Sequence, residues 1–237
     1  MAEQYPYWLE IDHQAIINNL VFLRNQISPR TKLFPVIKAN AYGHGILAVA
    51  QTLDTRPEVA GVVVNAIEEA LLLRDKNFSK RIVVAGAFRT KDLVVAAQQQ
   101  QIELELVNSD SLDLLQSLLL SHPPLKIHIK LNTGLNRLGF GESELSDVMN
   151  RLRETPNLQI QGLFSHLANS EDPQSLQTVH QISTFKEIIQ QYPGYENHIA
   201  SSVGALVIPE AHFDIVRVGI STYGLWPSPE VEILWHK

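Results

Sequence analysis

The sequence predicts one α/β domain, a (β/α)8 TIM barrel, and three observations support this fold class. Its 237 residues match the roughly 200–250 residues that a single α/β barrel occupies. Its hydrophobic content of 45% is enough for one large core. Short apolar, β-branched runs alternate with segments whose apolar residues recur at helical spacing, which implies parallel strands joined by crossover helices.

Eight apolar runs are predicted as strands, and eight strands that alternate with crossover helices imply closure into a barrel. Helical spacing is evident at residues 66–74, 110–120 and 176–191. The connection over 203–213 is short and contains Pro209, so its helix is predicted to have only a turn or two. The predicted strands span residues 32–40, 59–65, 81–86, 104–109, 126–133, 160–166, 197–202 and 214–220.

Both ends of the chain lie outside this alternation. Residues 7–11 (YWLEI) are predicted to form a strand without an obvious partner in the barrel, and Asp12 is placed to cap a helix over 13–27. At the other end, residues 226–229 (WPSP) interrupt the pattern, and a new apolar run stops at Lys237. We therefore expect a truncated chain, with residues 226–237 starting a connection beyond the barrel.

Composition limits the classes of partner. The net charge of −6 and the pI near 5.8 are the opposite of a nucleic-acid footprint, which needs clustered Lys and Arg. The absence of cysteine excludes disulfides and thiolate catalysis and fits a reducing compartment. No segment has the length of apolar residues that a membrane-spanning helix needs. The sequence predicts a cytoplasmic protein with a small-molecule substrate, no membrane association and no nucleic-acid partner.

The segment FPVIKANAYGHG, residues 34–45, carries the strongest chemical signal. Lys38 follows four apolar residues, and a lysine amine removed from water has a lowered pKa and can form a Schiff base with an aldehyde. The alternative is a lysine whose stem packs on the rim while its amine stays in water. Polar residues and glycines over 40–45 favour a ligand site, because such residues gather where backbone approaches a ligand.

The same segment resembles the pyridoxal phosphate lysine signature of alanine racemases. Two further stretches resemble that family, KLNTGLNRLGF over 130–140 and VRVGISTYG over 216–224. The resemblance implies that this chain is the N-terminal barrel of a homodimeric isomerase that binds pyridoxal 5'-phosphate. Such an enzyme interconverts L- and D-alanine, and D-alanine is a cell wall precursor. It also implies that a β-rich second domain follows the barrel and that residues 7–11 belong to that domain.

Polar residues from five predicted strands are expected at one end of the barrel, where the carboxyl ends of the strands meet. They are Lys38, Lys130, His166, Ser202 and Arg217.

Arg217 lies on a predicted inner strand, where a guanidinium needs a buried partner. A structural salt bridge is one reading. The resemblance implies another, in which Arg217 faces the pyridine nitrogen of the cofactor. Arginine stays protonated near neutral pH, so it would donate a hydrogen bond to that nitrogen without transferring a proton.

A phosphate site is predicted near the loops after the seventh and eighth strands. The resemblance implies the hydroxyls of Tyr42 and Ser202 and the amides of Gly219 and Ile220. Ser201 stands where the family usually has asparagine, so it is the weaker candidate. The alternative for each is an ordinary turn residue.

The remaining candidates are His166, Lys130 and Arg137. The resemblance implies that the His166 ring packs against the pyridine ring, whereas a lone histidine is otherwise a structural residue. It implies that Arg137 approaches the cofactor oxygen and the substrate carboxylate. It also implies that Lys130 positions Arg137, with carbamylation of the lysine as a means that the sequence does not show. Asn132 replaces the usual aspartate of this motif. The alternative is a loop with two solvated cations.

Inversion at Cα needs two acid/base groups on opposite faces of a planar intermediate. Lys38 is the predicted catalytic residue on one face, and the resemblance implies a tyrosine of the β-rich domain on the other. A chain without that domain is expected to bind the cofactor and racemise poorly. Two other readings stay open at this point, a single-domain pyridoxal-phosphate homeostasis protein and a related amino-acid decarboxylase. No metal site is predicted.

Overall fold

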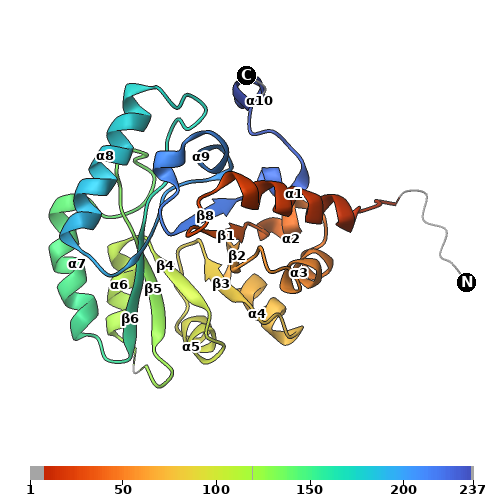
Figure 1. The fold of residues 1–237 in the computed structure, drawn as a ribbon. Coiled ribbons are helices and arrows are strands. Elements are labelled where there is room, and N and C mark those ends of the chain that lie inside the picture. The colour runs from red at the N-terminus through yellow and green to blue at the C-terminus, as the bar shows by residue number, and fades with distance from the viewer. Residues whose placement is uncertain (1–7, 119, 236–237) are drawn as a thin grey trace, which may run out of the picture.

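The computed structural model describes residues 8–118 and 120–235, and within them it has the predicted barrel (Figure 1). Short strands follow one another along the chain, each ladder between them is parallel, and helices lie between successive strands. The fold class and all eight predicted strands are confirmed. The strands are β1 (Lys32–Pro35), β2 (Gly61–Val64), β3 (Arg81–Val84), β4 (Glu103–Leu106), β5 (Leu125–Lys130), β6 (Leu158–Phe164), β7 (Glu196–His198) and β8 (Ile215–Val218).

The barrel closes through contacts between two sheets. Strands β2 to β7 form one sheet in sequence order, and β8 pairs with β1 in the other. Parallel bridges link β1 to the second strand region at Leu33–Val59 and Val36–Val63. On the opposite edge, the amide of Arg217 donates to a backbone carbonyl after β7 at 3.0 Å.

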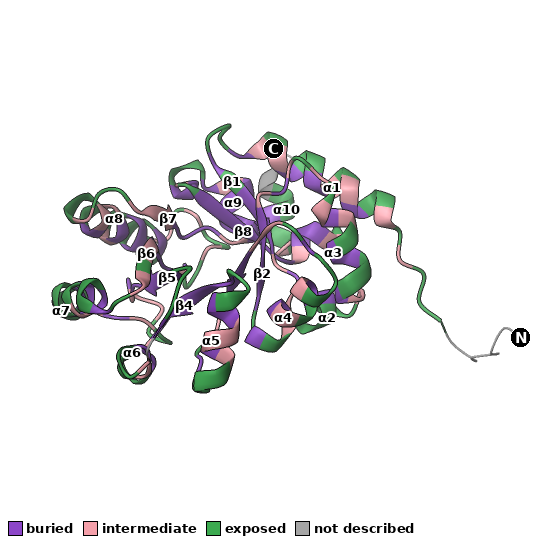
Figure 2. Ribbon diagram, turned by 90° about the horizontal axis from the view of Figure 1, so that it is seen from below, coloured by how far each residue is buried: buried purple, intermediate pink, exposed green. Residues whose placement is uncertain are grey.

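Helices form the outer layer, and Figure 2 shows buried residues on the strands and on the helix faces that meet them. Asp12 caps α1 as predicted, because its Oδ1 accepts a hydrogen bond from the amide of Ala15 at 3.0 Å. The short helix expected in the last connection is α9, followed by a 3-10 turn at Pro209. The helices are α1 (His13–Gln26), α2 (Lys38–Tyr42), α3 (Ile46–Asp54), α4 (Ile67–Asp75), α5 (Lys91–Gln99), α6 (Ser109–Gln116), α7 (Glu142–Glu154), α8 (Leu176–Gln191), α9 (Ser202–Val207), η1 (Pro209–Ala211), η2 (Ile220–Tyr223) and α10 (Pro229–Trp235).

The inside of the barrel has an apolar half and a polar half. Phe34, Val63, Val83 and Ile215 form an apolar cluster that is separate from the main core between strands and helices. The inward positions of β4, β5 and β7 carry charged and polar side chains instead, and these are buried. Because successive residues of a strand point to opposite faces, the apolar neighbours of these polar residues face the helices.

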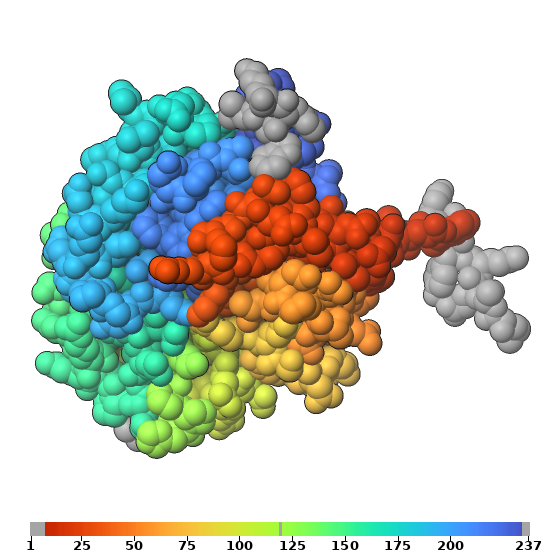
Figure 3. All heavy atoms as spheres, viewed as in Figure 1, coloured from red at the N-terminus to blue at the C-terminus, as the bar shows by residue number. Residues whose placement is uncertain are grey.

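The predicted strand at the N-terminus has no partner within the described chain, and its assignment to a second domain stays a prediction. Residues 8–11 form no strand, and Tyr7 lies outside the described residues. Trp8 and Leu9 are 76% and 82% exposed, and the segment stands away from the barrel surface (Figure 3). A strand needs a neighbour for its backbone hydrogen bonds, and none of the described residues offers one here. At the other end, the apolar run around Val231 forms α10, which packs against α9.

No helix in the described parts of the chain combines the length and the apolar character needed to cross a bilayer.

Candidate active site

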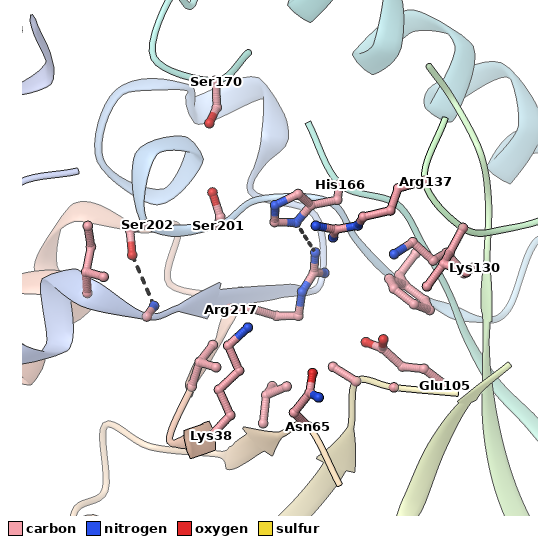
Figure 4. Close-up of a pocket in the computed structure, with 18 of the residues that line it drawn as sticks. Lys38, Asn65, Glu105, Lys130, Arg137, His166, Ser170, Ser201, Ser202 and Arg217 are labelled. Atoms are coloured by element: carbon pink, nitrogen blue, oxygen red, sulfur yellow. Dashed lines mark hydrogen bonds between the residues drawn. The ribbon is translucent and has the colours of Figure 1, made fainter. Parts of the chain in front are cut away.

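A cavity of about 600 Å³ lies at the carboxyl ends of the strands (Figure 4). Residues on the strands, or in the loops that follow them, line this cavity from all around the barrel. Active sites of this fold lie at the same end of the barrel. The structure brings every predicted site residue to this cavity. These residues are Lys38, Tyr42, Lys130, Arg137, His166, Ser202, Arg217, Gly219 and Ile220.

Lys38 is half-buried and its amine points into the cavity (Figure 4). The sequence predicted that Lys38 ends the first strand. In the structure β1 ends at Pro35, and Lys38 is the first residue of α2. Backbone pairing continues beyond β1 to Ile37, whose amide donates to the carbonyl of Val63 at 2.8 Å. The lysine is therefore carried by the point at which the extended chain turns away from the barrel.

The turn after Lys38 is left-handed. Residues 39–42 all have φ between 52° and 56°. This conformation costs an L-residue roughly 1–2 kcal/mol, so surrounding contacts must hold it. The amide of Ala39 donates to Glu69 Oε1 at 2.7 Å, and Asn40 Oδ1 accepts from the amide of Ile46 at 2.9 Å. Backbone strain of this kind is typical of functional sites.

Arg217 is 7% exposed and forms no ion pair within the described chain, so the structural salt bridge is not present. Its Nη2 donates to the carbonyl of Ser165 at 2.8 Å, and its Nη1 donates to His198 Nδ1. Burial lowers the pKa of Arg217, and the charge of Glu105 opposes that shift. The guanidinium still carries its proton near neutral pH, as arginine does in proteins.

A chain of hydrogen bonds runs from Arg217 through the polar half of the barrel. His198 Nε2 lies 3.0 Å from His128 Nδ1, and His128 Nε2 lies 2.8 Å from Glu103 Oε2. Glu103 also accepts two hydrogen bonds from Arg81, at 2.7 Å each. The carboxylate of Glu103 is therefore the common end point of two sets of donors.

The direction of this chain fixes the tautomers of both histidines. Arginine has only donors, so His198 Nδ1 must accept and its proton lies on Nε2. His198 Nε2 then donates to His128 Nδ1, which leaves the proton of His128 on Nε2, facing Glu103. Burial and the nearby charge of Arg217 hold the pKa of His198 well below its usual value, in agreement with a neutral ring.

His166 is also a neutral ring beside Arg217. Its Nδ1 lies 3.4 Å from Arg217 Nη2 and accepts from it (Figure 4). Burial and the charge of Arg217 lower the pKa of His166 to about 3. A ring that stays neutral is suited to packing and hydrogen bonding and not to donating a proton at neutral pH.

Ser202 and Gly219 meet in another part of the cavity, where the amide of Gly219 donates to Ser202 Oγ at 3.0 Å. A Cβ on Gly219 would lie 2.8 Å from the hydroxyl oxygen of Tyr42, so the glycine lets this hydroxyl approach the backbone. Burial raises the pKa of Tyr42, which keeps its hydroxyl protonated. Ile220 begins η2 directly after this glycine, and Ser201 also lines the cavity.

Lys130 ends β5 and is 6% exposed. Its Nζ lies 5.4 Å from the centre of the Phe164 ring, within the range of a cation–π contact. Burial lowers the pKa of Lys130, while the charge of Glu105 opposes the shift. Lys130 is thus buried, in contrast to the solvated lysine of the alternative reading.

Asn132, which replaces the family's aspartate, organises the loop that carries Arg137. Its Oδ1 accepts from the amides of Gly134 and Asn136 at 3.2 and 3.0 Å. Its Nδ2 donates to Asn136 Oδ1 at 3.0 Å. An amide oxygen satisfies the same backbone donors as a carboxylate oxygen would, so the replacement preserves the loop.

Sequence reasoning missed Glu105, which lines the cavity beside the predicted cations. It is 3% exposed, and its Oε1 has no hydrogen-bond partner among the described residues. Burial raises the pKa of Glu105 to about 7, against the lowering effect of the nearby charges of Arg217, Lys130 and Lys38. The signal was present in the strand ELEL, where glutamates alternate with leucines in a buried segment.

Comparison with known proteins places this geometry in a family. A family model for the N-terminal domain of alanine racemase matches residues 11–227. The alanine racemase of Nostoc sp. is 34% identical over an alignment that covers 95% of this chain and 60% of that protein. The alanine racemase of Geobacillus stearothermophilus is 34% identical over 230 residues, which cover 96% and 59%. The chain therefore spans about 60% of the length of these curated relatives.

Solved structures have the same barrel. The alanine racemase of Bacillus anthracis with bound L-Ala-P superimposes with a TM-score of 0.87 at 28% identity, over 96% of this chain and 60% of that one. The alanine racemase of E. faecalis gives a TM-score of 0.87 at 27% identity, over 96% and 62%. By family model, sequence identity and fold, this chain belongs to the alanine racemase family and corresponds to its N-terminal domain.

Proposed function

We propose that this chain is the cofactor-binding barrel of a pyridoxal 5'-phosphate-dependent alanine racemase that acts in the cytoplasm as a homodimer. The observation that carries the proposal is the convergence of Lys38, His166, Ser202 and Arg217 on one cavity. The names of the relatives support alanine as the substrate, and the composition, without cysteine, supports a reducing compartment.

The residues of the cavity fit a phosphate-bearing pyridine aldehyde. Ser202 and Tyr42 offer hydroxyls near Gly219, and the missing side chain of Gly219 lets the Tyr42 hydroxyl come close to the backbone there. We assign the phosphate to these residues together with the amide of Ile220. Lys38 supplies the amine for the aldehyde, and Arg217 supplies a donor for the ring nitrogen.

When bound to an amine, pyridoxal phosphate acts as an electron sink that makes the α-proton of an amino acid acidic. Arg217 tunes that property, because it donates a hydrogen bond and keeps its own proton. The chain from Arg217 to Glu103 holds the guanidinium in one orientation. His166 remains neutral beside it and positions the ring.

Lys38 takes or returns the α-proton on its own side of the substrate, since its amine points into the cavity. Arg137 and Lys130 bind the substrate carboxylate by charge and hydrogen bonding. We assign the second acid/base, on the opposite side, to the tyrosine that the family resemblance implies for the β-rich domain of the dimer partner.

The first experiment tests the role of Lys38. The chain is incubated with pyridoxal phosphate, reduced with borohydride, digested and mapped by mass spectrometry. We expect the label on Lys38, its loss in Lys38→Arg and its retention in the matched variant Lys130→Arg. Label on Lys130, or no label, would contradict the proposal.

A second measurement tests the proton transfer. We expect the loaded chain to exchange the α-proton of L-alanine with deuterium from the solvent, because this step needs only Lys38. The variant Lys38→Arg should lose the exchange. Exchange that persists in this variant would assign the base to another residue.

A further inference from the structure

Glu105 is a buried carboxyl group that faces the cavity. It lies on β4, whose leucines at 104 and 106 belong to the core between strands and helices. Figure 4 shows its carboxyl group pointing into the cavity. One oxygen has no hydrogen-bond partner in the described chain. A buried polar atom without a partner is rare in native proteins, so this one calls for a ligand or a change of charge.

Four cations face Glu105 from different elements. They are Arg217 on β8, Lys130 on β5, Lys38 on α2 and Arg137 in the loop after β5. Among the described residues, no ion pair joins any of them to Glu105. The ionised carboxyl therefore depends on the summed field of the four charges. Burial opposes ionisation and raises the pKa of Glu105 to about 7, so both forms are accessible near neutral pH.

The same cations would hold the anionic groups of a ligand. According to the proposed function, on which this ligand class rests, those groups are a phosphate and a carboxylate. An anion bound among the cations cancels part of the field that favours the ionised form of Glu105. Burial still disfavours the ionised form of Glu105, and less positive charge now stabilises it. The equilibrium of this carboxyl group therefore shifts toward the protonated form.

We propose that Glu105 is the internal anion of this cavity, which faces the cations when no anionic ligand is bound and takes up one proton from the solvent when such a ligand binds. The protonated carboxyl gains an O–H donor, so it no longer competes with the ligand for the cations. This role differs from that of Lys38, because no bond to the ligand is formed.

Thermodynamic linkage gives the sign of the effect. If the complex holds one more proton than the free protein, anion affinity falls as pH rises above the pKa of free Glu105, by up to about tenfold per pH unit. Below that pKa, Glu105 is already protonated in the free protein, so this group no longer makes the anion affinity depend on pH. The break should lie near pH 7.

The test uses sulfate and propionate as probes, since neither titrates near neutral pH. Binding to the full chain is measured by isothermal titration calorimetry at pH 8 in buffers of different ionisation enthalpy. We expect uptake of close to one proton per bound anion. Uptake with sulfate assigns the effect to the phosphate side of the cavity, and uptake with propionate assigns it to the Lys130 and Arg137 side.

Two variants make the measurement specific. Glu105→Gln preserves the shape of the side chain and should abolish proton uptake, with anion binding about tenfold tighter than in the wild type at pH 8. Glu171→Gln is the matched control, because Glu171 lines the same cavity but is exposed, and it should behave as the wild type. Uptake that persists in Glu105→Gln would overturn the proposal.

The wild-type protein alone also gives a decisive result, even if Glu105→Gln does not fold. Infrared difference spectra should show a protonated carboxyl band appearing when anion is added at pH 8. No proton uptake and no such band, or no binding of either probe, would overturn the proposal. Neither probe carries an aldehyde, so failure of borohydride trapping at Lys38 leaves this test intact.

Discussion

His198 Nε2 lies 3.0 Å from His128 Nδ1, and this contact connects Arg217 at the cavity to Glu103 deep in the barrel. Each group in this hydrogen-bond chain donates toward Glu103, and each of the two histidines has a single allowed tautomer. Removing the Glu103 carboxylate should therefore alter the hydrogen bond that His198 accepts from Arg217. The first prediction concerns the residue at that end.

Glu103→Gln should destabilise the protein by about 3–5 kcal/mol, because removing one member of a buried charged network leaves its partners uncompensated. Glu103 is 2% exposed and accepts from both His128 and Arg81. Chemical denaturation measures the change. Asp113→Asn, which removes an exposed partner of Arg151, is the control and should cost less than about 1 kcal/mol. Equal effects in both variants would argue against the network.

Gly162→Ala should also be destabilising, by about 1–3 kcal/mol or more, because the added methyl group overpacks the barrel interior. A Cβ at this position would lie 2.4 Å from His128 Nδ1 and 2.5 Å from the carbonyl oxygen of Glu196. The His198–His128 contact should be lost, which nitrogen NMR of the rings would detect. Gly141→Ala, where a Cβ meets only the ends of the Glu144 and Ser143 side chains, at 3.3 and 4.0 Å, should change stability little.

Stability should fall in acid through two sets of groups. Burial alone would raise the pKa of Glu103, but hydrogen bonds from His128 and Arg81 outweigh it and lower the pKa to about 2. A carboxyl with a lowered folded-state pKa contributes stability above its ordinary pKa of 4.5 and loses it as pH falls toward 2. At about 1.4 kcal/mol per unit, Glu103 alone accounts for on the order of 3 kcal/mol.

The histidines act in the same direction at higher pH. Because the folded protein holds the pKa of His166 at about 3, only the unfolded chain takes up a proton as pH falls below the ordinary value of 6.5. Glu105, whose raised pKa of about 7 has the opposite effect between pH 7 and 4.5, offsets one of these groups, but His166 and His198 both lose stability in this range. Thermal unfolding followed from pH 7 to pH 3 should therefore show a net loss. A flat profile, or the same profile in Glu103→Gln below pH 4.5, would contradict these assignments.

Asn132 permits a prediction about the departure from the family motif. Asn132→Ala should cost about 1–2 kcal/mol, because the amides of Gly134 and Asn136 lose their acceptor. Asn132→Asp should be nearly neutral, since the carboxylate accepts from the same amides and the Asn136 amide can turn to donate. Urea denaturation distinguishes the two. A larger loss in Asn132→Asp than in Asn132→Ala would show that the Nδ2 donor matters more.

Much of the fold follows from the sequence, because apolar runs with helical segments between them leave few other arrangements. Lys38, His166 and Arg217 could be placed together for the same reason: each follows or lies within a predicted strand, and the strands end at one face. The strand over residues 7–11 stays a prediction, because an apolar run forms a strand only when another strand lies beside it, and the expected neighbour belongs to the second domain.

The polar half of the barrel was not predicted, and the reason is physical. Whether Glu103, Glu105, His128 and His198 face the helices or the interior is set by barrel closure, which brings β4 to β7 around one space. The left-handed turn after Lys38 was also not predictable, since Ala39 and Ala41 disfavour positive φ and only the surrounding contacts impose it.

The two halves of the barrel interior impose different rules on sequence change. Around Phe34, Val63, Val83 and Ile215, only shape and volume must be matched, so compensating aliphatic exchanges are tolerated there. Between Arg217 and Glu103 each histidine nitrogen has one partner and must be either a donor or an acceptor. Residues of the polar half can therefore change only together with their hydrogen-bond partners. A barrel engineered for new chemistry is best varied first at the residues of the apolar half.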